Sequence, residues 1–239
     1  MRLVTWNINS LRLRLPLLAR LTSDLRPDVV CLQETKVPDP LFPADDLRAL
    51  GFKHLPYSGM KGYNGVAILS RHPLEPLSDL PVWYEKADCR HVAARVLAPS
   101  GSVELHDFYV PAGGDEPDPE ANPKFAHKLA FVEETARWFA NRTNQRTILV
   151  GDLNIAPPEH DVWNHKQLLT TVSHTPPATE RPQTRMQRGL VDPLRQLVPP
   201  AEKLHTCCSN RNRDWQDPNR GGRLAHVWRP PILLPGPPG

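Results

Sequence analysis

The sequence of 239 residues predicts an α/β fold with many strands, built as one domain. Short runs rich in β-branched and aromatic residues alternate irregularly with stretches of helical periodicity, and Pro and Gly separate them. A chain of this length can bury a large core in a single domain. The runs expected as strands are Leu3–Trp6, Val29–Leu32, Val66–Leu69, Val92–Val96, Val103–Tyr109 and Thr147–Val150.

Helical periodicity is clearest after Asn122–Pro123, where Asn can cap a helix and proline suits the first turn. A second helix is expected over Leu11–Leu25, with Pro16 in its first turn, where a missing N–H does no harm. In the helix after Asn122–Pro123 the apolar residues recur every three or four positions. They predict one buried stripe of Phe125, Leu129, Val132, Ala136 and Phe139.

Charge and cysteine content narrow the class of protein. The formal net charge of +3 does not by itself indicate a nucleic-acid partner. Six basic residues and two acidic ones lie between Lys203 and Arg229, which predicts a basic surface near the C-terminus. The four cysteines form no C-x-x-C pair, so neither a disulfide framework nor a zinc site is indicated. Without a signal sequence or an apolar stretch approaching ~18 residues, a reducing cytoplasmic location is expected.

The last ten residues differ in composition from the rest. Pro230–Gly239 contains five prolines, which remove backbone donors and fix φ. This segment is predicted to be neither helix nor central strand but an extended, mobile end. The expected division is therefore a domain over residues 1–229 and a proline-rich tail over 230–239.

Polar residues follow three of the expected strands, in Trp6–Asn9, Leu32–Lys36 and Val150–Asn154. Loops from different strand ends can converge on one site. Any one of these segments is more often an ordinary turn than a ligand set, but all three together are much less expected by chance. Oxygen ligands suit Mg²⁺, which binds through one or two carboxylates and substrate phosphate, so a phosphoryl-transfer site is predicted on Asn7, Glu34, Asp152 and Asn154.

A series of short motifs makes this prediction specific. The order of these motifs and their amino-acid sequences resemble those of the bacterial exonuclease III family, from residue 1 to about residue 228. The motifs are WNINSLR, LQETK, GVAILS, FYVPAGG, NPKFAHK, GDLNIAP, DVWNHKQLL, GLVD and NRDW…NRGGRL.

The resemblance implies a fold and a site. Two packed, mostly antiparallel sheets flanked by helices, a four-layer sandwich, are expected. Asn7 and Glu34 match the family's metal-binding pair, and Tyr109 matches a tyrosine close to the scissile phosphate. Asp152 matches the residue that orients or deprotonates the attacking water or helps to hold metal, and Asn154 matches a phosphate contact.

The implied activity is metal-dependent hydrolysis of DNA phosphodiesters at abasic sites and 3′ ends. The implied cofactor is Mg²⁺, with Mn²⁺ as a substitute, and the partner is double-stranded DNA with abasic or 3′-blocked ends, bound by a monomer. Basic and polar side chains would bind the DNA backbone through salt-dependent contacts. Those assigned to DNA are Arg90, Asn219 and Arg220; Lys61, Arg211 and Arg213 are weaker candidates, each more often a solvated surface charge.

The C-terminal part departs from the family. There the family has an Arg-Leu-Asp motif and a later Ser-Asp-His strand, whereas this chain reads Arg223–Leu224–Ala225 and continues into its proline-rich end. The last strand is therefore expected to be missing, the fold destabilised by an exposed edge and activity strongly impaired. His226 is expected to be a surface or strand-end residue. Thr206–Asn210 replaces aromatic residues that line the abasic-sugar pocket, which puts lesion recognition in doubt.

Two other functions stay open at this point. One is a catalytically dead, DNA-binding relative that keeps metal and backbone contacts, which Ala225 favours. The other is a metal-dependent phosphodiesterase acting on lipid or inositol phosphates, which shares Asn, Glu and Asp-x-Asn ligands. The motifs FYVPAGG and NRDW…NRGGRL resemble the DNA-acting branch and argue against this second alternative.

Overall fold

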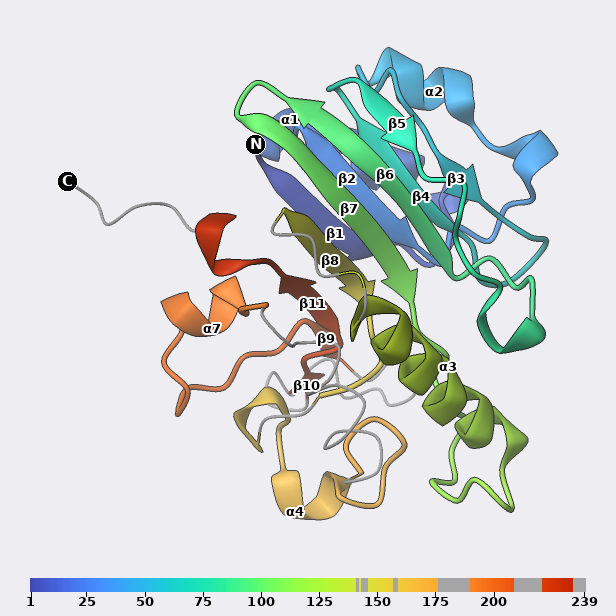
Figure 1. The fold of residues 1–239 in the computed structure, drawn as a ribbon, viewed down its shortest axis with the longest axis vertical. Coiled ribbons are helices and arrows are strands. Elements are labelled where there is room, and N and C mark those ends of the chain that lie inside the picture. The colour runs from blue at the N-terminus through green and yellow to red at the C-terminus, as the bar shows by residue number, and fades with distance from the viewer. Residues whose placement is uncertain (141, 143–145, 157–158, 176–189, 209–220, 234–239) are drawn as a thin grey trace. The chain divides into compact units, whose positions relative to one another are not determined.

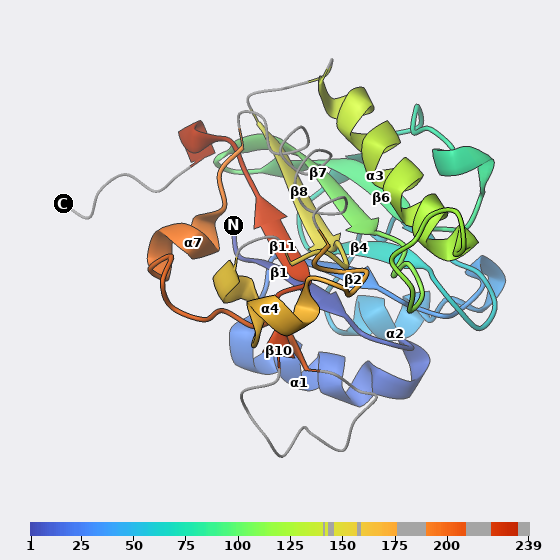
Figure 2. The same ribbon diagram turned by 90° about the horizontal axis from the view of Figure 1, so that it is seen from below.

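The computed structural model describes residues 1–140, 142, 146–156, 159–175, 190–208 and 221–233 (Figures 1 and 2). The chain divides into two compact units. The first unit comprises Met1–Val82, Lys86–Tyr109 and Gln145–Asp152, and the second comprises Trp83–Glu85, Val110–Asn144 and Leu153–Gly239. The prediction of a single domain over residues 1–229 stays a prediction.

The first sheet of the first unit has the strand order β1-β2-β4-β3. Its strands β1 and β2 run parallel, while β4 is antiparallel to both β2 and β3. Every residue of β2 and β4 is buried, because both faces of these central strands are covered. The bounds are Leu3–Asn7 for β1, Val29–Gln33 for β2, Tyr57–Ser58 for β3 and Val66–Ser70 for β4.

In the second sheet, β8, β7, β6 and β5 follow one another. The pairing of β7 with β8 is parallel, and the pairings of β6 with β7 and of β5 with β6 are antiparallel. All six expected strands form in the two sheets, each one to three residues longer than predicted. The bounds are Leu74–Pro76 for β5, His91–Ala98 for β6, Gly101–Tyr109 for β7 and Thr147–Asp152 for β8.

Helices cover one face of the first sheet, as Figure 2 shows for α1 and α2. The predicted helix with Pro16 in its first turn is confirmed as a short 3₁₀ turn, η1, followed by α1. Leu11, Leu18 and Leu47 pack with Leu32 and Leu69 of the sheet into an apolar core. The bounds are Arg12–Arg14 for η1, Leu15–Leu25 for α1, Asp39–Leu41 for η2 and Ala44–Ala49 for α2.

A buried polar pair lies between the two sheets of the first unit. Gln33 Nε2, at the end of β2, donates to Asp107 Oδ1 of β7 at 2.6 Å, and both residues are fully buried. Two oxygens of this pair, Gln33 Oε1 and Asp107 Oδ2, are buried without a partner in the described residues. Burial raises the pKa of the Asp107 carboxyl well above its usual value. A proton on Asp107 would turn its second oxygen into a hydrogen-bond donor, and Gln33 Oε1 is a buried acceptor that has no partner among the described residues.

The predicted helix after Asn122 is confirmed as α3, Pro123–Ala140, in the second unit. Four of the five expected stripe residues are buried, whereas Leu129 is half-buried. The other elements described in this unit are η3 (Trp83–Glu85), η4 (Glu159–Asp161), α4 (His165–Leu168), α7 (Pro193–Leu197), β9 (Cys207–Cys208), β10 (Gly221–Gly222), β11 (Ala225–Trp228) and η6 (Pro231–Leu233).

The proline-rich end departs from its prediction where it is described. Pro231–Leu233 forms the 3₁₀ helix η6, although this segment was expected to exclude any helix. A 3₁₀ turn needs one backbone bond, from Leu233 N to Pro230 O at 3.1 Å, and the prolines precede the donor and so remove nothing. Residues 234–239 lie outside the described residues. No helix in the described part of the chain is long and apolar enough to cross a membrane.

Candidate active site

Four strands of the first unit end in polar residues. Asn7 is the last residue of β1, and Glu34 directly follows β2. Tyr109 and Asp152 are the last residues of β7 and β8, and they are paired in the parallel register of these strands. Because β1 also runs parallel to β2, the side chains at each pair of strand ends leave the sheet at the same edge.

Hydrogen bonds join these four side chains into one cluster. Asn7 Nδ2 donates to Glu34 Oε1 and to Asp152 Oδ2, both at 2.8 Å. The Tyr109 hydroxyl donates to Glu34 Oε1 at 2.9 Å. The structure therefore brings together Asn7, Glu34, Tyr109 and Asp152, although they are separated by as many as 145 positions in the sequence.

A lysine that the sequence analysis gave no role completes the cluster. Lys36 Nζ lies 2.8 Å from Glu34 Oε2 and donates to Asn9 Oδ1 at 2.5 Å. The Asn9 backbone N–H in turn donates to Asn7 Oδ1 at 3.2 Å. Both Asn9 and Lys36 belong to the motifs quoted above, and that membership was the signal that could have found them.

The loops that carry these residues have unusual backbone conformations. Asn9, Glu34 and Lys36 have φ of 46°, 54° and 53°, values uncommon for residues with a side chain. Backbone hydrogen bonds between the loops hold them, including Ser10 N to Glu34 O at 2.7 Å. Such strain persists only where the surroundings impose it, and it concentrates at functional sites. The local geometry thus favours a functional site at this edge.

Electrostatics divide the roles of Glu34 and Tyr109. Burial alone would raise the pKa of Glu34, but hydrogen bonds from Asn7, Lys36 and Tyr109 outweigh it, so the pKa lies below its usual value. Burial, followed by the charge of Glu34, raises the pKa of Tyr109. At neutral pH the cluster therefore presents an ionised Glu34 carboxylate and a protonated Tyr109 phenol that donates to it.

Arg90, predicted to bind DNA, lies beside Tyr109. Its guanidinium carbon is 5.0 Å from the centre of the Tyr109 ring, and its Nη1 donates to the Tyr109 carbonyl at 3.3 Å. The guanidinium also pairs with Asp88, and the side chain is 12% exposed. Arg90 thus packs on the tyrosine that donates to Glu34 and keeps limited access to solvent.

The donor set of the cluster fits a hard divalent cation. It offers two carboxylates and an amide, and Mg²⁺ commonly binds one or two carboxylates while keeping several waters. Asn7 directs its nitrogen to both carboxylates here, so coordination by its oxygen would require the amide to turn. Among the residues that the structure describes, no three His, Cys, Asp or Glu side chains gather to hold an ion. Two carboxylates and one amide leave the remaining positions of a six-coordinate ion to water.

The remaining predicted residues lie elsewhere or are not described. Asn154 follows Asp152 by two positions but belongs to the second unit, where its Nδ2 donates to Val110 O at 2.8 Å. Asn219 and Arg220, predicted to bind DNA, lie outside the described residues. In the departing motif, the backbone N–H groups of Leu224 and Ala225 both donate to the Thr206 hydroxyl at 3.0 Å.

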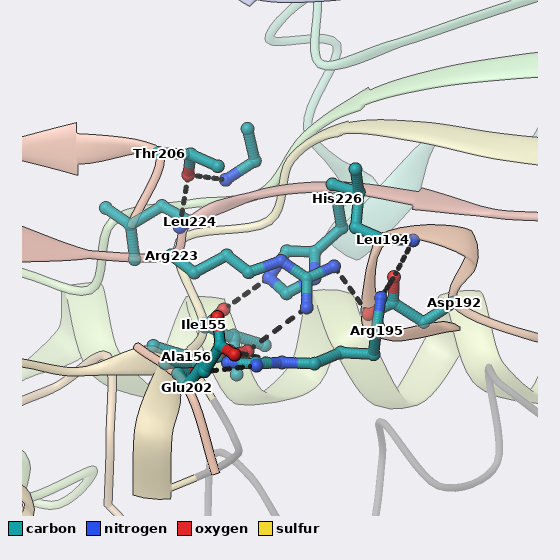
Figure 3. A network of polar contacts seen from close by, with 12 residues as sticks. Ile155, Ala156, Asp192, Leu194, Arg195, Glu202, Thr206, Arg223, Leu224 and His226 are labelled. Carbon is teal, nitrogen blue, oxygen red and sulfur yellow. Dashed lines mark hydrogen bonds and ion pairs between the residues drawn. The ribbon is translucent and has the colours of Figure 1, made fainter. Parts of the chain in front are cut away.

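The polar network around Arg223 corrects an expectation about charge (Figure 3). Arg223 is fully buried and bridges Asp161 and Asp192, while Arg195 donates to Asp161 as well. Arg223 was counted toward a basic surface near the C-terminus. Because its charge is enclosed by two carboxylates, it contributes nothing to such a surface.

His226 is also placed differently from its prediction. It was expected at the surface or at a strand end, yet it is 2% exposed within β11. Its Nε2 lies 2.8 Å from the carbonyl oxygen of Ile155, as Figure 3 shows. Burial, followed by the charge of Arg223, lowers the pKa of His226 to about 4. The ring is therefore neutral at pH 7 and donates through Nε2.

Comparison with known proteins identifies the family. A model of the Endonuclease/Exonuclease/phosphatase family matches residues 4–231. The chain belongs to this family. It is 30% identical over 236 residues to exodeoxyribonuclease III of Haemophilus influenzae, covering 95% of this chain and 86% of that protein. It is 27% identical to the DNA repair nuclease APEX1 of Danio rerio, covering 99% of this chain and 75% of that protein.

Solved structures of the family share the fold. An AP endonuclease from Archaeoglobus fulgidus matches with a TM-score of 0.85 and 29% identity, covering 96% of this chain and 87% of that one. The 3′ phosphatase NExo from Neisseria, bound to a product DNA hairpin, matches with a TM-score of 0.85 and 30% identity over the same shares. The predicted resemblance to exonuclease III and the predicted α/β sandwich of two sheets flanked by helices are confirmed.

Proposed function

We propose that this chain is a metal-dependent DNA-repair hydrolase that cleaves DNA phosphodiesters at abasic sites and 3′ ends. The observation that carries the proposal is the cluster of Asn7, Glu34, Tyr109 and Asp152 at adjoining strand ends. Relatives named exodeoxyribonuclease III and DNA repair nuclease, together with a structural relative bound to a DNA hairpin, support DNA as the substrate. We also propose that the chain acts as a monomer in the cytoplasm.

The proposed cofactor is Mg²⁺, which Mn²⁺ can replace, bound by Asn7, Glu34, Asp152 and Asn154. When bound, the ion would neutralise charge that develops on the phosphate. An ionised Glu34 suits this role, because a carboxylate that already carries its charge needs to lose no proton to bind a cation.

The chain's own residues have distinct roles in the proposed reaction. Asp152 accepts a proton from the attacking water, which makes the water a stronger nucleophile. Tyr109, held protonated, turns its single O–H from Glu34 to a phosphate oxygen and donates there. The Asn154 amide has two N–H groups, so that one can donate to phosphate while the other donates to Val110 O. Arg90, Asn219 and Arg220 bind the DNA backbone.

The test is cleavage of a duplex oligonucleotide that contains one abasic analogue. Cleavage is expected with Mg²⁺ and not with chelator, and Asp152→Ala should lose it while Asp24→Ala, which changes an exposed carboxylate of α1, should keep it. Cleavage that survives chelation, or that Asp152→Ala leaves unchanged, would overturn the proposal.

A second candidate is a DNA-binding protein without catalytic activity. The observation that favours it is Ala225 in β11, at the position where the family's motif has an aspartate. The same duplex separates the two: binding without cleavage in Mg²⁺ supports this candidate, and magnesium-dependent cleavage excludes it.

A further inference from the structure

The loop that follows β8 is held by three basic side chains on consecutive carbonyls. Lys128 Nζ donates to the Asn154 oxygen at 2.7 Å, and His226 Nε2 donates to the Ile155 oxygen at 2.8 Å. His174 Nδ1 donates to the Ala156 oxygen. All of these residues belong to the second unit. Figure 3 shows the imidazole of His226 directed at the carbonyl of Ile155.

Lys128 is the unusual member of this set. Its side chain is fully buried in α3, and lysine is almost never fully buried without partners. Besides Asn154, its ammonium donates to Val172 O at 2.6 Å and to Ala112 O at 3.3 Å. These three carbonyls match the three N–H groups of an ammonium and come from three separate segments. One charge thus fixes the Asn154 loop to two neighbouring segments.

The two histidines act as neutral donors. Burial lowers the pKa of both rings, which leaves one N–H on each at pH 7. In His226 the carbonyl of Ile155 selects the Nε2–H form. In His174, Nδ1 donates to Ala156 while Nε2 lies 2.7 Å from Nδ1 of His165 and accepts from it. The tautomer of each ring is therefore set by the hydrogen bonds around the loop.

The segment they hold has a constrained conformation. Asn154 has φ of 51°, in the left-handed region, and its side chain reaches Val110 O. Backbone bonds from Leu153 N to Leu224 O and from Ala156 N to Ser173 O, both at 2.9 Å, fix the two ends of the segment. Between these ends, three side-chain donors bind the carbonyls of Asn154, the proposed phosphate contact, and of the two residues that follow it.

We propose that Lys128, His174 and His226 are positioning residues. They hold Asn154 in the orientation needed for catalysis. This inference rests on the proposed function, in which Asn154 contacts the phosphate. Misplacement of a catalytic group by about 1 Å can cost about 10²-fold in rate, so loss of the ammonium should reduce kcat more than it weakens DNA binding.

The first experiment compares Lys128→Met with Lys124→Met, an exposed lysine one turn earlier on the same helix. On the abasic duplex with Mg²⁺, Lys128→Met should lower kcat about 10- to 100-fold with KM changed less than about twofold, while Lys124→Met keeps the kcat of the unaltered chain. An unchanged kcat in Lys128→Met would overturn the inference.

A second pair of variants covers the case in which Lys128→Met does not fold. His226→Gln keeps an N–H that can reach the Ile155 carbonyl, and His226→Leu removes it. We expect His226→Gln to retain most of the kcat and His226→Leu to lose about tenfold, the effect of roughly one hydrogen bond. Equal activity of the two variants would contradict a positioning role.

Hydrogen exchange separates failure of this inference from failure of the proposed function. The amides of Leu153 and Ala156 should exchange faster in Lys128→Met and in His226→Leu, while those of α3 keep their protection. This readout needs no cleavage, so it decides whether the side chains hold the loop even if the unaltered chain does not cut DNA. Faster exchange spread evenly over the second unit would show a merely structural role.

Discussion

At the scale of single residues, the hydroxyl of Tyr109 is the clearest target, because it donates to an ionised carboxylate. Hydrogen bonds to charged groups contribute about 1.5–3 kcal/mol. We expect Tyr109→Phe to lower kcat on the abasic duplex at least about tenfold while the fold is kept, and Tyr63→Phe, which removes an exposed hydroxyl, to have no effect. Equal rates for the two variants would show that the Tyr109 hydroxyl has no role in catalysis.

Residue patterns predicted which side chains to look for but not how they are paired. Polar residues after apolar strands indicated Asn7, Glu34 and Asp152, and the structure brings these together. Lys36 could not be found in this way, since a lysine in a loop is usually a solvated charge. Its ammonium reaches Glu34 through a left-handed turn, and no periodicity reports such a turn.

At the scale of elements, the two sheets of the first unit meet at Gln33 and Asp107. Because the pKa of Asp107 is raised in the folded state, folding favours its protonated form. The stability that this proton provides is complete below about pH 4, the usual pKa of aspartate, and is lost as pH rises through the folded-state pKa. Asp107→Asn carries the donor permanently, so it should be more stable than the unaltered chain at neutral pH.

Thermal unfolding from pH 4 to pH 8 checks this expectation. The Tm advantage of Asp107→Asn should vanish near pH 4 and grow as pH rises. Asp79→Asn, in an exposed loop, is a control that should follow the unaltered chain. If Asp107→Asn is less stable at every pH, the buried carboxyl is ionised and the proposed sharing of a proton with Gln33 is wrong.

Elements with strong periodicity were predictable, and short ones were not. Central strands such as β2 and β4 appear as continuous apolar runs because both of their faces are buried. By contrast, β3 and β10 have two residues each and form only where a partner strand offers its edge. Their existence depends on tertiary pairing, which local pattern does not contain.

At the scale of the whole molecule, the net charge of +3 is small, so the proposed binding of DNA would depend on individual contacts to the phosphates. Each phosphate neutralised contributes about 0.9 to the slope of log K against log salt. We expect Arg90→Gln to reduce this slope by about 0.9 on the abasic duplex. The exposed Arg95, paired with Glu75, provides the control Arg95→Gln, which should leave the slope unchanged. An unaltered slope in Arg90→Gln would show that Arg90 contacts no DNA phosphate and only packs on Tyr109.

The division of the chain into two units was not predictable from its pattern. Segments of each unit alternate along the sequence, and Asp152 and Asn154 fall in different units although two positions apart. A change in amino-acid composition marks a domain boundary only where a linker separates the domains. Here the ends of β7 and β8 continue directly into the second unit, so no such change occurs. The series of motifs identified the family correctly, because the order of motifs along the sequence does not depend on how the chain divides into structural units.

The residue before Asp152 places a limit on how this chain can vary. Gly151 has φ of 138°, and a Cβ there would overlap the carbonyl oxygen of Phe108, its neighbour on β7. In a library that samples every amino acid, position 151 should therefore yield folded protein with glycine alone. Position 152, by contrast, should accept replacements that fold and do not cut DNA. Two adjacent codons would then be constrained by different requirements, the first by folding and the second by chemistry.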